Sequence, residues 1–142
     1  MKHLKTLLIV LFVTALLVTA CAPAGEPILK ATGSVASEKA WTDAQLKKME
    51  MVSADYTDKE GVTTTYTGVP IMKLLDEAGI KDGATAVVFV ASDGYTAETT
   101  LEELKACTNC IVAFNDDGTL RTVMPDFPGK LQVKGVTELQ VK

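Results

Sequence analysis

Apolar residues follow two different patterns along the chain. Leu7 to Ala20 is an apolar run broken only by Thr14 and Thr19, whereas later apolar stretches are short and separated by polar turns. Several of these stretches are rich in β-branched residues and bounded by glycine or aspartate, which is typical of strands. The pattern therefore predicts an N-terminal leader followed by a small domain made mostly of β-structure.

Seven extended segments are predicted in that domain. All residues of 86–91 are apolar, as expected for a central strand buried on both faces. Segments 51–56 and 62–67 flank an Asp58–Gly61 turn and should form a hairpin. The other strands are expected at 95–99, 111–114, 120–124 and 131–141, the last with a kink at Gly135.

Three short helices are predicted between the strands. Thr42 and Thr100 each precede a glutamine or glutamate by three residues, which is the capping-box arrangement of a helix start. The first helix should extend through Met49, and the second should begin at Pro70 and end at Gly79. Strands outnumber helices about seven to three without alternating strictly with them. The sequence therefore predicts an α+β domain rather than a doubly wound parallel sheet.

The first twenty residues have the composition of a secretory signal. Lys2, His3 and Lys5 give a basic start, and the apolar run that follows is too short to span a bilayer comfortably. The run ends in Val-Thr-Ala-Cys at residues 18–21, which resembles a bacterial lipobox. We therefore expect Cys21 to be acylated, and two or three acyl chains to hold the protein stably on a membrane.

The predicted organisation has three parts. Residues 1–20 form the signal peptide, residues 21–31 a lipidated tether with two prolines and one glycine, and residues 32–142 the folded domain, which should begin near Thr32. A lipoprotein of this kind is expected to be membrane-anchored and extracytoplasmic, on the cell surface or in the periplasm.

Charge and histidine content exclude several functional classes. The chain has 14 Lys and Arg against 18 Asp and Glu, and removal of the leader takes Lys2 and Lys5 with it, which leaves a net charge of −6. An acidic domain does not attract nucleic acid. The only histidine, His3, also lies in the leader, so the mature chain lacks the commonest general base and any His-ligated metal site.

Cys107 and Cys110 form a Cys-x-x-Cys sequence at the end of the third predicted helix. Outside the cytoplasm such a pair is expected to be oxidised, and at this spacing a disulfide would fix a local turn. Reversible thiol–disulfide exchange and ligation of a metal or cofactor remain alternatives. Two thiolates alone do not complete a zinc site, and the chain has no second Cys-x-x-Cys.

Three segments resemble, in order and spacing, the molybdopterin-binding domain of the sulfite oxidase superfamily: 67–75, 92–95 and 120–125. The resemblance covers about 32–142. It implies an α+β fold of several stacked mixed β-layers with about three short helices, and molybdopterin as a cofactor. The C-terminal segment agrees at Pro125, Gly129, Lys134, Val136, Leu139 and Val141.

The resemblance also implies a binding site and a departure from the family pattern. Arg121 and Lys134 fall where the family has cationic side chains near its pterin, and Asp93 and Tyr95 would lie beside that pocket unless they serve only a hairpin turn and sheet packing. Catalytic members bind molybdenum through a cysteine on the strand before the second helix. Here that strand has no cysteine, and Ser53 would be a poor donor to the metal.

Three functional hypotheses follow from the sequence. The favoured one is a non-catalytic relative that binds a small anionic ligand or a protein partner, because both the thiolate and the family's histidines are missing. The second is a molybdopterin-dependent oxidoreductase in which Cys107 or Cys110 replaces the missing ligand. The third is a surface thiol–disulfide module that uses the same two cysteines.

Overall fold

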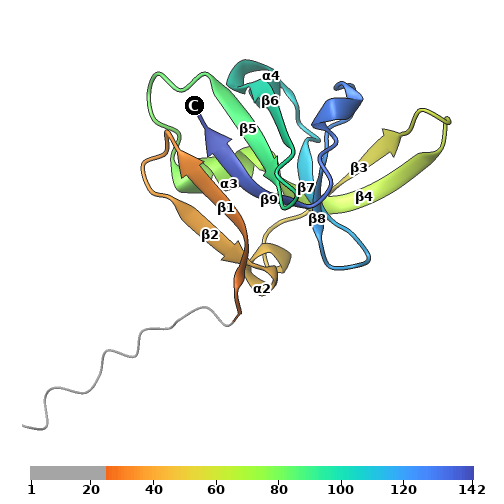
Figure 1. Cartoon of the computed structure of the whole chain (residues 1–142), viewed down its shortest axis with the longest axis horizontal. Helices are drawn as coiled ribbons and strands as arrows, with labels where there is room; N and C mark the ends of the chain where they lie inside the picture. Colours follow the sequence, from red (N-terminus) through yellow and green to blue (C-terminus); the bar gives the residue numbers. More distant parts are fainter. Residues whose placement is uncertain (1–24) are drawn as a thin grey trace, which may run out of the picture.

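The fold is described for residues 25–142 of a computed structural model of the chain, so Cys21 and the predicted leader lie outside the described part. Nine strands, three α-helices and one 3-10 helix occur in this part (Figure 1). In chain order they are β1 (Pro27–Gly33), β2 (Lys39–Thr42), α2 (Asp43–Lys47), β3 (Val52–Thr57), β4 (Thr63–Pro70), α3 (Ile71–Ala78), β5 (Ala86–Ala91), β6 (Thr96–Thr100), α4 (Leu101–Ala106), β7 (Ile111–Phe114), β8 (Leu120–Val123), η1 (Gly129–Leu131) and β9 (Val136–Val141).

The strands form two sheets. The first has the order β2-β1-β9-β5-β6, in which β1 and β9 run parallel and the other neighbours run antiparallel. The second has the order β3-β4-β7-β8 and is antiparallel throughout. Short helices stand between the strands along the chain, and both sheets are largely or wholly antiparallel. This arrangement confirms the predicted α+β class.

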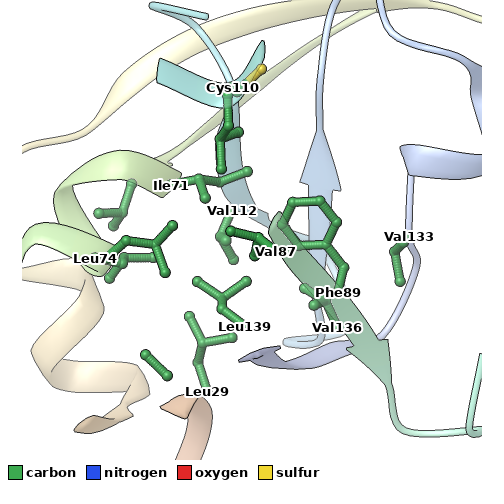
Figure 2. Packing of buried hydrophobic residues seen from close by; sticks show 14 of the residues in the cluster. Leu29, Ile71, Leu74, Val87, Phe89, Cys110, Val112, Val133, Val136 and Leu139 are labelled. Atoms are coloured by element: carbon green, nitrogen blue, oxygen red, sulfur yellow. The ribbon is translucent and has the colours of Figure 1, made fainter. Parts of the chain in front are cut away.

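The main hydrophobic core lies between the first sheet, α3 and the second sheet (Figure 2). Strand β5 lies between β9 and β6, and its Val87 and Phe89 are completely buried, as the continuous apolar run predicts. Helix α3 directs Ile71, Leu74 and other apolar residues at helical spacing into the same core. Leu29 of β1, Val112 of β7 and Leu139 of β9 complete it.

The helix ends follow the sequence signals. The Thr42 hydroxyl accepts a hydrogen bond from the backbone of Gln45, whose side chain accepts one from Thr42, and Thr100 and Glu103 repeat this arrangement. Hydrogen bonds from the hydroxyl and the backbone N–H of Thr100 lower the pKa of Glu103. Pro70 is the residue before the first turn of α3 rather than its first residue. Within residues 25–142 no helix is long and apolar enough to cross a membrane.

The predicted domain boundary at Thr32 is wrong by five residues. Pro27–Gly33 form β1, which pairs with β2 on one side and β9 on the other, so part of the expected tether belongs to the first sheet. Leu29 and Ala31 point into the core and are fully buried, while Lys30 between them is exposed. This period-two alternation is short and follows two prolines, which is why the segment looks like a tether in the sequence.

The predicted last strand, 131–141, is also corrected. Only Val136–Val141 are a strand, and Leu131 belongs to η1. Gly135 has a φ of +68°, which turns the chain between the two sheets. The backbone of Val133 and Lys134, before this glycine, pairs with β8 of the second sheet. After the glycine, β9 pairs with strands of the first sheet.

The β3–β4 hairpin extends beyond the rest of the second sheet (Figure 1). Strand β4 pairs with β7 only at Gly68–Pro70, so its first half pairs with β3 alone. Gly68 allows the close approach at this crossing, since a Cβ there would lie 2.1 Å from the carbonyl oxygen of Val112. We call residues 55–66 the hairpin arm.

Candidate functional site: a buried arginine under the hairpin arm

The register of the second sheet brings tyrosine and arginine side chains to one face. Ala54 pairs with Tyr66, and Ala113 pairs with both Gly68 and Arg121, so alternation along the strands places Tyr66 and Arg121 on the same face. A small buried cluster covers this face. It consists of Ala54, Ile111, Ala113 and Val123, with Val52, Tyr56 and Tyr66 packed against it.

Arg121 is the only arginine of the chain, and it exposes 7% of its surface. Its Nη1 donates a hydrogen bond of 2.7 Å to the hydroxyl of Tyr66. The centre of the guanidinium lies 4.5 Å from the ring centroid of Tyr66 and 5.8 Å from that of Tyr56. These cation–π contacts hold the guanidinium in place and offset part of the cost of removing it from water.

No carboxylate neutralises Arg121 within the described residues. The three ion pairs of residues 25–142 are Lys47–Asp43, Lys73–Glu50 and Lys142–Glu98, all on the surface. The Nε of Arg121 is buried and has no hydrogen-bond partner. A buried cation without a counter-ion is costly, which makes Arg121 a candidate anion-binding residue.

Arg121 lies at a pocket of about 430 Å³ between the hairpin arm and the C-terminal segment. Lys134 lines the same pocket, and its backbone forms a bridge to that of Arg121. The structure therefore brings together the two cationic residues singled out in the sequence. Tyr56, Lys59, Glu60 and Val62 line the pocket from the hairpin arm, and Gly129 and Gln132 line it from the C-terminal segment.

Two side chains fix the C-terminal wall of the pocket. The Gln132 amide accepts a hydrogen bond from the backbone N–H of Met124 at 3.0 Å and donates one to its carbonyl oxygen at 2.6 Å. The Thr122 hydroxyl donates to the carbonyl oxygen of Leu131 and accepts from the N–H of Val133. Both residues are buried, so the segment that carries Lys134 is held firmly against β8.

Asp93 and Tyr95 do not line this pocket. The Asp93 carboxylate accepts a hydrogen bond from the backbone N–H of Tyr95 within the β5–β6 turn. The side chain of Tyr95 is 46% exposed, and its hydroxyl donates to the carbonyl oxygen of Lys130 in η1. Tyr95 therefore supports the helical turn that contains Gly129, and Asp93 supports a hairpin turn.

Sequence reasoning missed the two tyrosines that enclose Arg121. Tyr56 and Tyr66 stand on either side of the Asp58–Gly61 turn at positions that the hairpin brings to one face. The hairpin itself was predictable from the sequence. In its register Tyr56 pairs with Thr64 and Tyr66 with Ala54, so the two tyrosines are diagonal neighbours. Their contact with Arg121 depends on the order of β4, β7 and β8, which the sequence does not reveal.

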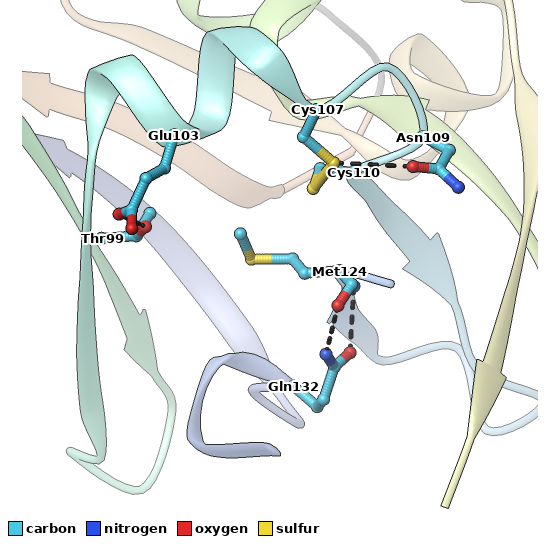
Figure 3. The surroundings of a disulfide bond; sticks show 7 residues. All are labelled: Thr99, Glu103, Cys107, Asn109, Cys110, Met124 and Gln132. Atoms are coloured by element: carbon cyan, nitrogen blue, oxygen red, sulfur yellow. Dashed lines mark hydrogen bonds between the residues drawn. A yellow bond between two sulfur atoms is a disulfide. The ribbon is translucent and has the colours of Figure 1, made fainter. Parts of the chain in front are cut away.

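Cys107 and Cys110 form a disulfide at the end of α4 (Figure 3). Cys107 is half-buried, and Cys110 exposes only 3% of its surface. Cys107 lines a separate pocket with the 125–128 loop, and Figure 3 shows Met124 between the disulfide and Gln132. Cys107, Arg121 and Lys134 therefore do not share one pocket.

The disulfide is expected to stabilise the domain only modestly. Its loop is four residues long, for which the chain-entropy model gives about 2 kcal/mol. Cys107→Ser combined with Cys110→Ser should lower the free energy of unfolding by about that amount, as measured by urea denaturation. A loss of more than about 4 kcal/mol would show that the bond does more than restrict this turn.

Residues 49–56, where the resemblance places the family's molybdenum ligand, contain no cysteine. Residues 25–142 contain no group of three or more His, Cys, Asp or Glu side chains arranged to hold a metal ion, and the two cysteines are bonded to each other. Ser53 is exposed, and its side chain points to the opposite face of β3 from those of Ala54 and Tyr56. Its hydroxyl lies 3.3 Å from that of Thr67 on this opposite face, away from Tyr66 and Arg121.

Comparisons with known proteins agree with this fold. The family model described as "Oxidoreductase molybdopterin binding domain" matches residues 26–142. The sulfane dehydrogenase SoxCD from Paracoccus pantotrophus has a similar fold, with a TM-score of 0.68 and 18% identity over 80% of this chain and 37% of that chain. The present chain thus spans little more than a third of that SoxCD chain.

No curated protein matches the chain. The family match nevertheless covers most of it, from β1 to the last residue, and it confirms the resemblance carried by segments 67–75, 92–95 and 120–125. The chain therefore belongs to the oxidoreductase molybdopterin-binding domain family.

Proposed function

We propose that this domain binds a small anion in the pocket at Arg121 and does not carry out molybdenum chemistry. The observation that supports this most directly is the buried guanidinium of Arg121, which has no carboxylate partner within residues 25–142. The chain has 18 Asp and Glu against 14 Lys and Arg, so carboxylates that could pair with an arginine are numerous. An unneutralised arginine among them is best explained by a ligand that supplies the negative charge.

The roles of the surrounding residues follow from their contacts. Arg121 would bind the anion through the part of its guanidinium that Tyr66 does not engage. Tyr66 and Tyr56 orient the guanidinium, and Lys134 adds a second positive charge from a segment that Gln132 holds in place. Binding of this kind involves no bond making or breaking by the protein.

We further propose that the domain acts outside the cytoplasm, attached to a membrane through an acylated Cys21. Two observations support this location: the lipobox-like sequence at residues 18–21 and the disulfide between Cys107 and Cys110. The acidic composition argues against nucleic acid as a partner. The bound anion, or a protein that recognises the bound state, is then the partner to identify.

Membership of the family supports a second candidate, a molybdopterin-dependent oxidoreductase. The two candidates differ in metal content. Protein expressed with its own leader in a molybdenum-replete host should contain no molybdenum by elemental analysis, because the described residues supply no thiolate for it. Molybdenum at near-stoichiometric amounts would reject the proposed function in favour of the enzyme.

Anion binding can be measured by thermal stability. A ligand that binds only the folded state raises the melting temperature, and at ten times its Kd it adds about 1.4 kcal/mol, or roughly 5 °C for a domain of this size. We expect benzenesulfonate to raise the melting temperature of the wild-type domain in a saturable way. An equal rise in a variant that lacks Arg121 would mean that the anion binds elsewhere.

A further inference from the structure

We infer that the pocket at Arg121 selects an organic ligand with a single negative charge, such as a sulfonate or a carboxylate, over a dianion such as a phosphate monoester. This inference rests on the proposed anion-binding function and adds the charge class of the ligand. It follows from the charges that line the pocket. Lys59, Arg121 and Lys134 carry three positive charges, and Asp58 and Glu60 carry two negative charges, so the lining has a net charge of +1.

The two acidic residues belong to the turn of the hairpin arm. The Asp58 carboxylate accepts hydrogen bonds of 2.9 Å from the backbone N–H groups of both Glu60 and Val62, so it is fixed beside the pocket. Glu60 is exposed and takes part in none of the three ion pairs within residues 25–142. Neither carboxylate is therefore neutralised by a lysine, and both weaken the positive potential of the pocket.

A weak positive potential favours one charge over two. The attraction between ligand and pocket increases in proportion to the charge of the ligand, whereas the cost of removing the ligand from water increases with the square of that charge. Arg121 is itself almost completely buried, so the bound group has to be at least partly desolvated to reach it. For a dianion the free-energy cost of desolvation is about four times that of a monoanion, whereas its attraction to the pocket is only about twice as large.

The remaining lining favours an organic body attached to the charged group. Val62 lines the pocket and exposes 56% of its surface, and the half-buried Tyr56 is part of the same lining. The pocket volume of about 430 Å³ also exceeds that of a single inorganic ion, since one water molecule occupies about 30 Å³. A short apolar or flat group could cover Val62 and Tyr56 while its anionic end approaches Arg121.

The test compares two aromatic anions of similar shape. Benzenesulfonate carries one negative charge at both pH 8.0 and pH 5.0, whereas phenyl phosphate changes from a dianion to a monoanion as the pH falls through about 6. In NMR titrations of the full domain at pH 8.0, we expect phenyl phosphate to bind at least about fivefold more weakly than benzenesulfonate. At pH 5.0 the two affinities should agree within about threefold, because the charges then match.

Substitution of one rim carboxylate provides an independent readout. Glu60→Gln raises the lining charge to +2, and the gain in binding free energy should be twice as large for a dianion as for a monoanion. If benzenesulfonate binds about threefold more tightly to the variant at pH 8.0, phenyl phosphate should bind about ninefold more tightly. Glu102→Gln is the matched control, because Glu102 is exposed on α4 and does not line the pocket.

The outcomes separate this inference from the function on which it rests. If phenyl phosphate binds the wild type at pH 8.0 as tightly as benzenesulfonate or more tightly, and does so through Arg121, anion binding stands and the preference for a single charge is rejected. Equal gains for both ligands in Glu60→Gln would reject it as well. If neither anion produces saturable shifts that depend on Arg121, the proposed function fails and the inference fails with it.

Discussion

Gly68→Ala is expected to prevent the domain from folding stably. A Cβ at this position would lie 2.1 Å from the carbonyl oxygen of Val112 and 2.6 Å from the Cα of Ala113, both backbone atoms of the neighbouring strand. Neither atom can move without opening the pairing of β4 with β7, which consists of only three residue pairs. We expect a loss of at least about 3 kcal/mol, a large part of the stability of a small domain, measured by urea denaturation.

Gly129→Ala is the matched control for this substitution. Gly129 does not adopt a positive φ, and a Cβ there would meet only the hydroxyl of Tyr56 at 4.0 Å, an ordinary contact. Its free energy of unfolding should stay equal to that of the wild type or increase slightly, because alanine restricts the unfolded chain. Similar losses in both variants would contradict the specific role of the β4–β7 crossing.

Arg121→Met is expected to abolish anion binding without destabilising the fold. Methionine keeps much of the length of the side chain and can pack against the rings of Tyr56 and Tyr66, while the buried charge is removed. Charged hydrogen bonds contribute about 1.5–3 kcal/mol each, so the loss of two should weaken benzenesulfonate binding by more than about 100-fold. The melting temperature without ligand should remain equal to that of the wild type or rise.

Lys105→Met serves as the control for net charge. Lys105 is exposed on α4 and does not line the pocket, so its replacement removes one positive charge without touching the site. Benzenesulfonate affinity should then change by less than about twofold at physiological ionic strength, because salt screens distant surface charges. Loss of binding in this variant too would indicate a general electrostatic effect instead of a pocket built around Arg121.

Local signals predicted much of the fold. Both capping boxes, the turn between β3 and β4 and the buried strand β5 depend on residues close together in the sequence, and all of them occur as expected. The prediction failed where long-range pairing decides the structure. Strand β1 is stabilised by β9 from the other end of the chain, and the segment before Gly135 is held by β8.

The candidate site was predictable in part for the same reason. Arg121 and Lys134 carry chemistry that is visible in the sequence, and the family resemblance brought them together. Tyr66 meets Arg121 across 55 positions of sequence, through a strand order that no local pattern contains. The absence of a counter-ion within the described residues is likewise a property of the folded arrangement, since aspartates and glutamates are frequent along the chain.

The position of β9 has a consequence for how the domain is made. This strand lies between β1 and β5, and its pairing with β1 joins residues more than 100 positions apart. A nascent chain that has not yet released residues 136–141 lacks the strand that joins two halves of the first sheet, so its folding has to wait until synthesis has passed this point. During that interval Ala31 and Phe89, which both pair with Leu139 of β9 in the complete sheet, lack this neighbour.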